Sequence, residues 1–408
     1  MKVLLANKFF YLKGGSEYVF FESARIFKER GDSVSFFSMK HPKNISTEYS
    51  KYFVSNVDYE KGGIKNMLVA SLKLLYSIES MKKIEELLRD DKPDIAHLHN
   101  IHHQISPSII KSLKKQNIPV IVTLHDYKMV CAIYSMISNG KVCEACKNGR
   151  YYKCFMKSCV KESRMKSLIN TIEMYLHHKI LHIYDSVDIF ISPSIFLKNK
   201  VKEMGFKGRI EHLPNFVNVH DYEPSFIGSE NAIVYFGRLS KEKGLFTLID
   251  AVKGLRIKLK IIGEGPMKAD LETMVMNKKI NNVDFLGYRE GDALKDEIRK
   301  SQFIVLPSEW YENNPRSLIE GFALGKPALC ARIGGISELV QDDKTGLTFE
   351  SGNSDDLRDK ISKLVSNASQ LEHMGRNARK MAEEEFNPEI HYQRLMEIYK
   401  QAIHHNWQ

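Results

Sequence analysis

Short apolar runs that end in polar residues recur along the first half of this chain. The run KVLLAN at 2–7 is followed by a helical pattern at 16–30 and by a second run, SVSFFSM. Three later runs of the same kind are DIAHLHN, VIVTLHD and DIFISPS. Apolar strands that alternate with helices are typical of a parallel sheet covered on both faces. The pattern therefore predicts a doubly wound α/β domain.

The second half of the chain repeats this pattern. Residues 213–226, LPNFVNVHDYEPSF, contain two prolines and two asparagines, which predicts a linker. The strand-like runs after it are AIVYFG, IKLKIIG, VDFLG and FIVLP, with helical segments near 242–253, 266–279 and 291–301. We therefore expect a first domain at 1–215 and a second at 216–387, followed by a helix at 388–408 that begins at Pro388.

Length and charge limit the function classes. The chain has 408 residues, 43% of them hydrophobic, which is enough for two cores. Its formal net charge of +10 favours an anionic partner, which nucleic acid, a membrane surface or a phosphorylated small molecule would each supply. No apolar run approaches a membrane span and the N-terminal residues turn polar early, so we expect a cytoplasmic protein.

One segment has apolar residues at helical spacing over an unusually long distance. Between Ile64 and Leu88 they stand at 64, 67, 68, 71, 72, 75 and 78. Such an amphipathic helix would either bury its apolar face in the core or lie on an anionic membrane. The second interpretation predicts peripheral attachment at the inner face of the cell membrane.

The stretch WYENNPRSLIEGFALGKP at 310–327 places two carboxylates, Glu312 and Glu320, around a predicted helix start. Pro315 suits the first helical position and Gly325 the end, so the free N–H groups and the helix dipole would favour a phosphate. The alternative is a surface pair between Arg316 and Glu320, with Glu312 as a solvated loop acid.

A basic loop follows the first strand of the second domain. In YFGRLSKEKG, Arg238 and Lys243 stand just after the strand. Two cations at the carboxyl end of a parallel strand would hold a pyrophosphate, Arg through a bidentate fork and Lys as a point charge. The alternative is an ordinary solvated loop.

These motifs resemble the donor site of family 4 glycosyltransferases, which have the two-domain GT-B fold. The resemblance rests on Arg238 and Lys243 followed by two glutamates with seven residues between them. KGGSE, SPS, LPN, GEGP and GKP also stand where that family has them. It implies two Rossmann-like domains that face a central cleft, an acceptor-binding one first and a nucleotide-sugar-binding one second, and a C-terminal helix that returns to the first. The chain has NNP where many members have Phe-Gly.

The resemblance implies a role for each donor-site residue. Glu312 would bind hydroxyls of the donor sugar and Glu320 the ribose, while Arg238 and Lys243 would neutralise the diphosphate leaving group. The other implied donor contacts are Gly14 and Gly15 near the phosphate, Tyr288 near the base, and Asn313, Asn314 and Pro315 at the helix start. The reaction implied is transfer with retention from a UDP or GDP sugar.

Polar residues at two strand ends are candidates for the acceptor side. In TLHDY, the resemblance places His125 beside the donor sugar and makes Asp126 a candidate near the acceptor hydroxyl. The alternative is an Asp that caps its own loop beside a packed His. His99 and Asn100, in HLHNIHHQ, would line the acceptor pocket. The four histidines there also suggest a metal, but no carboxylate partner is evident.

The enzyme class has a second candidate. A nucleotide-sugar dehydrogenase or epimerase would need Gly-x-Gly-x-x-Gly after the first strand, and NKFFYLKGG lacks it. The chain also lacks an Asp-x-Asp triplet, the metal-binding signature of the other large glycosyltransferase fold. We therefore expect catalysis without a divalent cation.

A cysteine-rich insertion spans 131–160. CEACKNGRYYKCFMKSC contains Cys143, Cys146, Cys154 and Cys159 within 17 residues. Four thiolates at such spacing would close a structural zinc site. Disulfides or a redox pair, and thiols with no joint role, are the alternatives; a reducing cytosol disfavours the disulfides.

Together these features predict a retaining hexosyltransferase that acts on a glycan or polyprenyl-linked acceptor in the synthesis of a cell-surface polysaccharide such as capsule, exopolysaccharide or O-antigen. The non-enzyme alternative is a basic zinc-knuckle protein that binds nucleic acid through KNGRYYKC. It would leave the set of two cations and two glutamates unexplained, so we expect no nucleic-acid partner.

Overall fold

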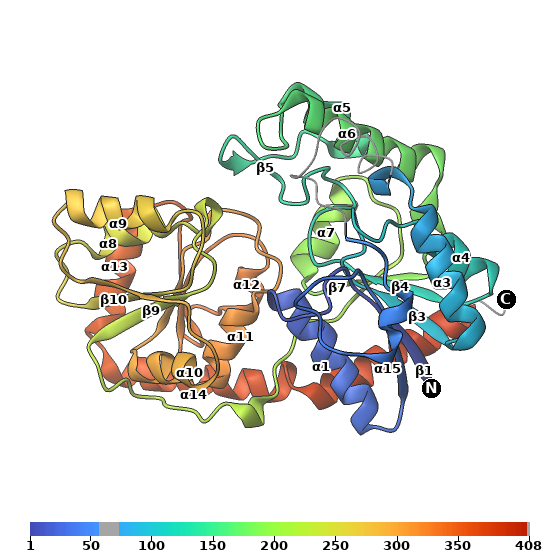
Figure 1. Ribbon diagram of the computed structural model, residues 1–408. Coiled ribbons are helices and arrows are strands. Elements are labelled where there is room, and N and C mark those ends of the chain that lie inside the picture. The colour runs from blue at the N-terminus through green and yellow to red at the C-terminus, as the bar shows by residue number, and fades with distance from the viewer. Residues whose placement is uncertain (57–72, 406–408) are drawn as a thin grey trace. The chain divides into compact units, whose positions relative to one another are not determined.

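The computed structural model describes residues 1–56 and 73–405. The chain forms two compact units (Figure 1). The first comprises Met1–Ser138, Cys143–Leu213 and the C-terminal residues from Tyr392; the second comprises Pro214–His391 with Asn139–Val142. The division after Leu213 lies within the linker predicted from the prolines and asparagines.

The first unit is built on a parallel sheet of six strands. Its order is β2-β1-β3-β4-β7-β8, so the direction of strand addition changes between β1 and β3. Four of these strands are completely buried or nearly so, as expected for a sheet covered on both faces. The strands are β1 Lys2–Ala6, β2 Ser33–Phe37, β3 Ile95–Leu98, β4 Val120–Thr123, β7 Ile189–Ser192 and β8 Ile210–His212.

Helices α1 and α15 share one core with this sheet. Phe20 and Phe27 of α1 pack with Leu395 and Tyr399 of α15 against strand residues such as Val3. The C-terminal helix therefore belongs largely to the first unit. The helical elements of this unit outside the insertion are α1 Gly15–Glu29, η1 Glu48–Tyr52, α3 Ile78–Asp90, α4 Ile109–Lys115, α7 Ile195–Glu203 and most of α15 Pro388–His405.

The second unit has the sheet order β11-β10-β9-β12-β13-β14, again parallel. The order is that of the Rossmann fold, with its switch point between β9 and β12. The strands are β9 Ala232–Phe236, β10 Lys258–Ile262, β11 Val283–Gly287, β12 Ile304–Leu306, β13 Ala328–Ala331 and β14 Gly346–Phe349. Both units thus confirm the predicted doubly wound α/β architecture.

Crossover helices cover both faces of the second sheet. Helix α8 packs against α13 and α11 packs against α14 (Figure 1). Right-handed crossovers that leave a switch point in opposite directions place α8 and α11 on opposite faces. The helical elements are η5 Val219–Asp221, η6 Lys241–Lys243, α8 Leu245–Val252, α9 Lys268–Asn277, α10 Gly291–Lys300, α11 Arg316–Ala323, α12 Ile336–Leu339, α13 Ser354–Val365 and α14 Ala368–Glu385.

The insertion after β4 is a hairpin followed by short helices. Its strands and helical elements are β5 Ile137–Ser138, β6 Lys141–Val142, η2 Lys147–Gly149, α5 Tyr152–Met156, α6 Arg164–Tyr175, η3 Leu176–Ile180 and η4 Ile183–Ser186. Helices α5 and α6 pack together through a small apolar cluster that includes Cys154 and Met174.

The predicted long amphipathic helix at 64–88 is partly wrong. Its first nine residues lie outside the described part of the chain. In the rest, Tyr76 and Ser77 are not helical, and the Ser77 side chain caps a new helix, α3, by accepting from the Ser80 N–H. Ile84 and Leu87 are buried in the core, whereas Ile78, one of the positions of the predicted apolar face, is 64% exposed, so membrane attachment through this segment stays a prediction.

Candidate active site

Two loops of the second unit start at neighbouring strands of its switch point. The loop after β9 contains Arg238 and Lys243, and the loop after β12 contains Glu312. Ligands of open α/β sheets bind outside the carboxyl ends of the strands at this position. The topology therefore brings together residues 69 positions apart in the sequence.

Lys243 and Glu312 form an ion pair in this region. The Lys243 Nζ lies 2.5 Å from Glu312 Oε1, and the same oxygen accepts a hydrogen bond of 2.7 Å from the Ser308 hydroxyl. Lys243 also stands over the Trp310 ring, 5.4 Å from its centroid. The Glu312 side chain is only 6% exposed, so the alternative of a solvated loop acid is wrong.

The protonation state of Glu312 follows from these contacts. Burial by itself would raise the pKa of the carboxyl, but the Lys243 charge and the hydrogen bonds from Lys243 and Ser308 outweigh it and lower the pKa. Glu312 is therefore an ionised, acceptor-only group at neutral pH.

Two glycines allow the loops to approach each other. Gly244 has φ +67°, and a Cβ at this position would overlap the carbonyl oxygen of Pro307 at the end of the neighbouring strand. Gly334 has φ +63°, and a Cβ there would overlap the backbone of Glu312. The next N–H, of Gly335, donates to the Glu312 carbonyl at 2.7 Å. Both glycines thus fix the position of the ion pair.

Helix α11 begins directly after Glu312. Pro315, predicted at the first helical position, has ψ 115° and is instead the N-cap, and Gly325 follows the helix end with φ +73°. The Asn314 side chain accepts from the Asn215 N–H at 3.0 Å, which ties the loop to the linker. Asn313 lies between these residues and is partly exposed.

Glu320 is held within the second unit by two partners. Its carboxylate lies 2.8 Å from Arg316 and accepts from the Tyr222 hydroxyl at 3.1 Å. The pair between Arg316 and Glu320, considered above as the alternative, is therefore formed. Both side chains are only 15% exposed. Tyr222 belongs to the segment predicted as a linker, and its role had no sequence signal.

Two predicted donor residues are more exposed. Arg238 is exposed, and its carbonyl accepts from the Tyr235 hydroxyl at 2.8 Å. Tyr288 is 67% exposed and its hydroxyl donates to Glu290 at 2.8 Å. The side chains of both residues are accessible to a ligand.

In the first unit, the loops after β1 and β3 meet at the switch point of its sheet. The Asn100 N–H donates to the Asn7 side chain at 3.2 Å, and its carbonyl accepts from the Lys8 N–H at 3.1 Å. Gly14 and Gly15 are exposed at the start of α1, where a Cβ on Gly14 would meet only Glu17 at 3.7 Å. This helix start therefore leaves room for a ligand beside the backbone.

Histidines at the carboxyl ends of the neighbouring strands β3 and β4 contact one another. His99 Nδ1 lies 2.9 Å from His125 Nε2, and the ring of His97 stacks on that of His99. Burial, with a smaller contribution from Lys8, lowers the pKa of His125 to about 4. The imidazole is therefore neutral at physiological pH.

Asp126 occupies a loop that it also stabilises. Its carboxylate accepts from the Lys128 N–H at 2.8 Å, as the capping interpretation expects. Burial raises its pKa despite this hydrogen bond. Asp126 as a whole is partly exposed.

The cysteines lie close together without forming a described metal site. Within residues 1–56 and 73–405, no three His, Cys, Asp or Glu side chains are placed to hold a metal ion. Cys154 and Cys159 hydrogen-bond each other across the end of α5, where Cys159 N–H also donates to the Cys154 carbonyl at 3.2 Å. Lys157 Nζ lies 3.6 Å from the Cys143 sulfur. Cys146 packs against the apolar cluster between α5 and α6 that includes Cys154 and Met174. All four are thiols here.

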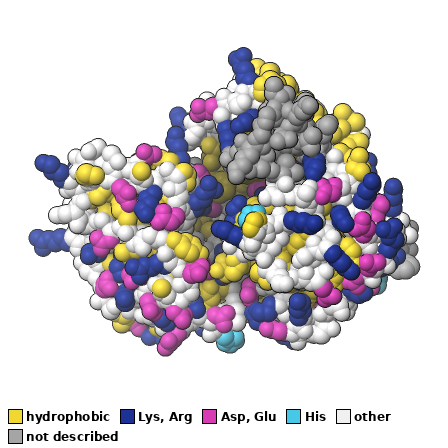
Figure 2. Space-filling model, in the orientation of Figure 1, with side chains coloured by type: hydrophobic (Ala, Val, Ile, Leu, Met, Phe, Trp, Pro, Cys, Tyr) yellow, Lys and Arg dark blue, Asp and Glu magenta, His cyan; other side chains and the backbone are white. Residues whose placement is uncertain are grey.

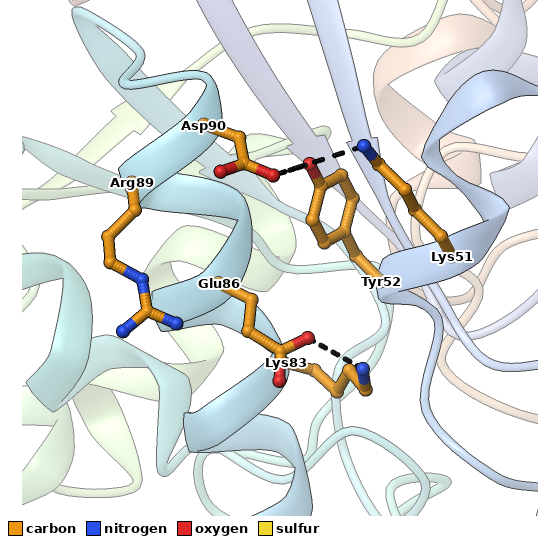
Figure 3. A pocket seen from close by; sticks show the side chains of 6 residues that line it. All are labelled: Lys51, Tyr52, Lys83, Glu86, Arg89 and Asp90. Atoms are coloured by element: carbon orange, nitrogen blue, oxygen red, sulfur yellow. Dashed lines mark hydrogen bonds and ion pairs between the residues drawn. The ribbon is translucent and has the colours of Figure 1, made fainter.

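A separate hollow lies between η1 and α3. It has a volume of about 320 Å³ and mixed charge (Figure 3). The Tyr52 hydroxyl donates to Asp90 at 2.5 Å, and Lys83 pairs with Glu86 at 2.6 Å. The lining residues are Lys51, Tyr52, Lys83, Glu86, Arg89 and Asp90, none of which is a predicted site residue.

Two Rossmann-like units with a cation and a glutamate at the second switch point are the arrangement expected of a GT-B glycosyltransferase, and the comparisons with known proteins show this class. Residues 13–221 match the family model for glycosyltransferase family 4, and residues 222–381 match that for glycosyl transferases group 1. The chain belongs to glycosyltransferase family 4.

Relatives and solved structures agree with this assignment. The chain is 26% identical over 332 residues to an uncharacterized glycosyltransferase of Methanocaldococcus jannaschii, covering 79% of this chain and 82% of that protein. It is 24% identical to the N-acetyl-alpha-D-glucosaminyl L-malate synthase of Bacillus anthracis, covering 96% and 94%. The crystal structure of Anabaena HepE in complex with UDP and glucose has the same fold, with a TM-score of 0.67, 16% identity and coverage of 98% and 99%.

Proposed function

We propose that this glycosyltransferase moves a hexose from a UDP or GDP sugar to a glycan or polyprenyl-linked acceptor, with retention of anomeric configuration. The observation that supports this most is the partly buried ion pair of Lys243 and Glu312 at the switch point. It presents a cation and a hydrogen-bond acceptor together, which a diphosphate and the hydroxyls of a sugar require.

Each donor residue has a distinct role in this proposal. Lys243 and Arg238 neutralise the diphosphate, Glu312 accepts from sugar hydroxyls, and Glu320 accepts from the ribose. Tyr222 and Arg316 hold the Glu320 carboxylate in position. The backbone N–H groups of Asn313 and Asn314 face the sugar or phosphate, and Tyr288 lies near the base.

The transfer step requires no covalent intermediate. The bond from the anomeric carbon to the diphosphate oxygen breaks, and the acceptor oxygen forms its bond on the same face. The acceptor proton moves to the departing diphosphate, whose charge Arg238 and Lys243 stabilise. Glu312, ionised and already bonded to Lys243 and Ser308, is assigned to substrate binding and not to nucleophilic attack.

The first unit supplies the acceptor side. Asp126 orients the acceptor hydroxyl, His125 lies beside the donor sugar as a neutral imidazole, and His99 and Asn100 line the acceptor pocket. Gly14 and Gly15 contact the donor phosphate. We place the enzyme at the cytoplasmic face of the cell membrane in polysaccharide synthesis. In the part of the chain that the structure describes, no helix is both long and apolar enough to cross a bilayer.

A binding experiment tests the donor assignment. Melting temperatures are measured with UDP, GDP and ADP sugars for the wild type and for Lys243→Met, because a ligand of the native state raises the melting temperature. We expect a shift with one nucleotide class in the wild type and none in the variant. Wild-type shifts that survive in Lys243→Met would contradict the role of Lys243.

Lys260 offers a matched control for this experiment. It is a buried lysine of the second unit that is also ion-paired, with Glu230 at 2.7 Å and Glu297 at 2.8 Å. Lys260→Met should lower the melting temperature of the free protein but keep the nucleotide-dependent shift. Salt-sensitive RNA binding with no nucleotide shift would instead favour the nucleic-acid alternative.

Structural zinc in the insertion stays a proposal. The four thiols are near one another, and hydrogen bonds with Cys154 and Ser138, with a smaller contribution from Lys157, outweigh burial and lower the pKa of Cys159 to about 6. Zinc would bind thiolates of Cys143, Cys146, Cys154 and Cys159 after local rearrangement. Catalysis itself would proceed without a divalent cation.

A further inference from the structure

Helix α6 is packed with its polar face inward. Its buried side chains include Ser167, Asn170, Thr171 and Glu173, whereas Met165 is 62% exposed and Ile172 is 45% exposed. Leu168, Ile169 and Leu176, which share the helical spacing of the exposed pair, are only partly buried. This is the reverse of an ordinary surface helix.

Specific polar contacts hold the helix in this orientation. Glu173 pairs with Lys128 at 2.7 Å, and both side chains are at most 3% exposed. The Thr171 hydroxyl contacts the Tyr151 carbonyl at 3.3 Å, and Ser167 Oγ accepts from the Val160 N–H at 3.0 Å. Turning the apolar face inward would break all of these contacts, so the exposure of Met165 and Ile172 is built into the fold.

The neighbouring helix α5 also exposes large apolar side chains. Tyr152, Phe155 and Met156 of α5 are 44%, 37% and 62% exposed and stand at i, i+3 and i+4, on one helix face. We define the α5–α6 surface as the exposed side chains Tyr152, Phe155, Met156, Met165 and Ile172. Such concentrations of exposed large apolar groups mark interaction sites.

Basic residues outnumber acidic ones in the segment that forms this surface. Residues 147–166 contain Lys147, Arg150, Lys153, Lys157, Lys161, Arg164 and Lys166, and Glu162 is the single acid among them. All but Lys153 of these basic residues are exposed. Figure 2 shows hydrophobic and basic side chains next to each other along the upper edge of the molecule, over the helices of the insertion.

We propose that the α5–α6 surface is a docking site for an anionic membrane. Apolar and aromatic side chains surrounded by Lys and Arg match the boundary between anionic head groups and acyl chains. A protein partner of ordinary composition would not require such a one-sided charge. The proposal rests on the proposed function, which places the enzyme at the membrane, and names the surface that would attach it, built from residues that the donor site does not use.

Vesicle sedimentation tests this proposal with the full-length protein. We expect binding to phosphatidylcholine vesicles that contain phosphatidylglycerol, and little to phosphatidylcholine alone. The double substitution Met165→Ser with Ile172→Ser should lower the partition coefficient about tenfold or more. Arg164→Gln with Lys166→Gln should lower it about thirtyfold at low salt and much less at high salt.

Met276→Ser is the matched control, because Met276 is 73% exposed on α9 of the second unit. It should leave vesicle binding unchanged, and the nucleotide-dependent melting shift should be the same in all four proteins. Absence of binding to anionic vesicles, or equal binding by wild type and both double variants, would overturn the proposal. Two other results would also overturn it, because each would mean that this face contacts protein and not lipid. One is a wild-type dimer that Ile172→Ser converts to a monomer. The other is a lower melting temperature of the Met165→Ser, Ile172→Ser variant with unchanged vesicle binding.

Discussion

Lys243 and Glu312 lie 2.5 Å apart because β9 and β12 are neighbours at the switch point of the second sheet. Removing Lys243 leaves the Glu312 charge buried without a cationic partner, which costs ~3–5 kcal/mol in typical proteins. We predict that Lys243→Met lowers the unfolding free energy by an amount of this order and lowers kcat/KM at least tenfold. Denaturant titration and steady-state kinetics measure both. Wild-type kcat/KM in a folded variant would contradict the donor site.

The same pair predicts an acid dependence of stability. The folded-state pKa of Glu312 is below its ordinary value of 4.5, so its contribution is complete above pH 4.5 and disappears as the pH falls through the folded pKa. Glu312→Gln should therefore reduce the loss of stability in this acid range. Chemical unfolding midpoints at decreasing pH test this, and a parallel pH profile for wild type and variant would contradict it.

His125 predicts a second pH effect. Its folded pKa is about 4 against an ordinary 6.5, so between these values the unfolded chain binds more protons than the folded protein. Stability should therefore rise with pH across this window, and His125→Gln should flatten that part of the profile. Thermal unfolding from pH 4 to pH 6.5 measures the slope. If the slope is unchanged in the variant, the pH dependence comes from other histidines whose pKa is lowered by burial, such as His178.

Glu320 predicts an effect on nucleotide affinity. Glu320→Ala removes the acceptor assigned to the ribose, and the affinity for the nucleotide should fall about tenfold or more. Glu383→Ala is the matched control, since Arg379 and Glu383 form another pair with Arg four residues before Glu, on α14. Isothermal titration with the nucleotide distinguishes them, and equal affinities would remove Glu320 from the site.

The cysteine cluster predicts a metal content. If the four thiols bind zinc, protein kept reduced throughout purification should contain about one equivalent, and Cys146→Ser should release it. Because cysteine ligands must lose their protons, affinity should fall at low pH. If metal analysis finds no zinc, the hydrogen-bonded thiol pair of Cys154 and Cys159 is the remaining joint function of these cysteines.

Much of the fold was determined by the sequence pattern. Apolar runs that end in polar residues identified nine strands of the two six-stranded sheets but not β8, β13 and β14. The prolines and asparagines around 213–226 located the boundary between the units. The spacing of Glu312 and Glu320 after Arg238 and Lys243 indicated the family. These signals are local, because strand periodicity, turn residues and motif spacing depend on nearby positions.

Other features depend on contacts between distant residues, which the pattern along the chain does not contain. The sequence did not reveal that Tyr222 would hold Glu320 or that Gly334 would support Glu312, because each pair joins separate segments. It also predicted one helix over 64–88 where Ser77 starts a new one. The orientation of α6 was decided by Glu173, whose buried partner Lys128 lies 45 residues earlier. Burying a charge is costly unless its partner is present, so the tertiary pairing, not the local apolar pattern, determined which face of that helix turned outward.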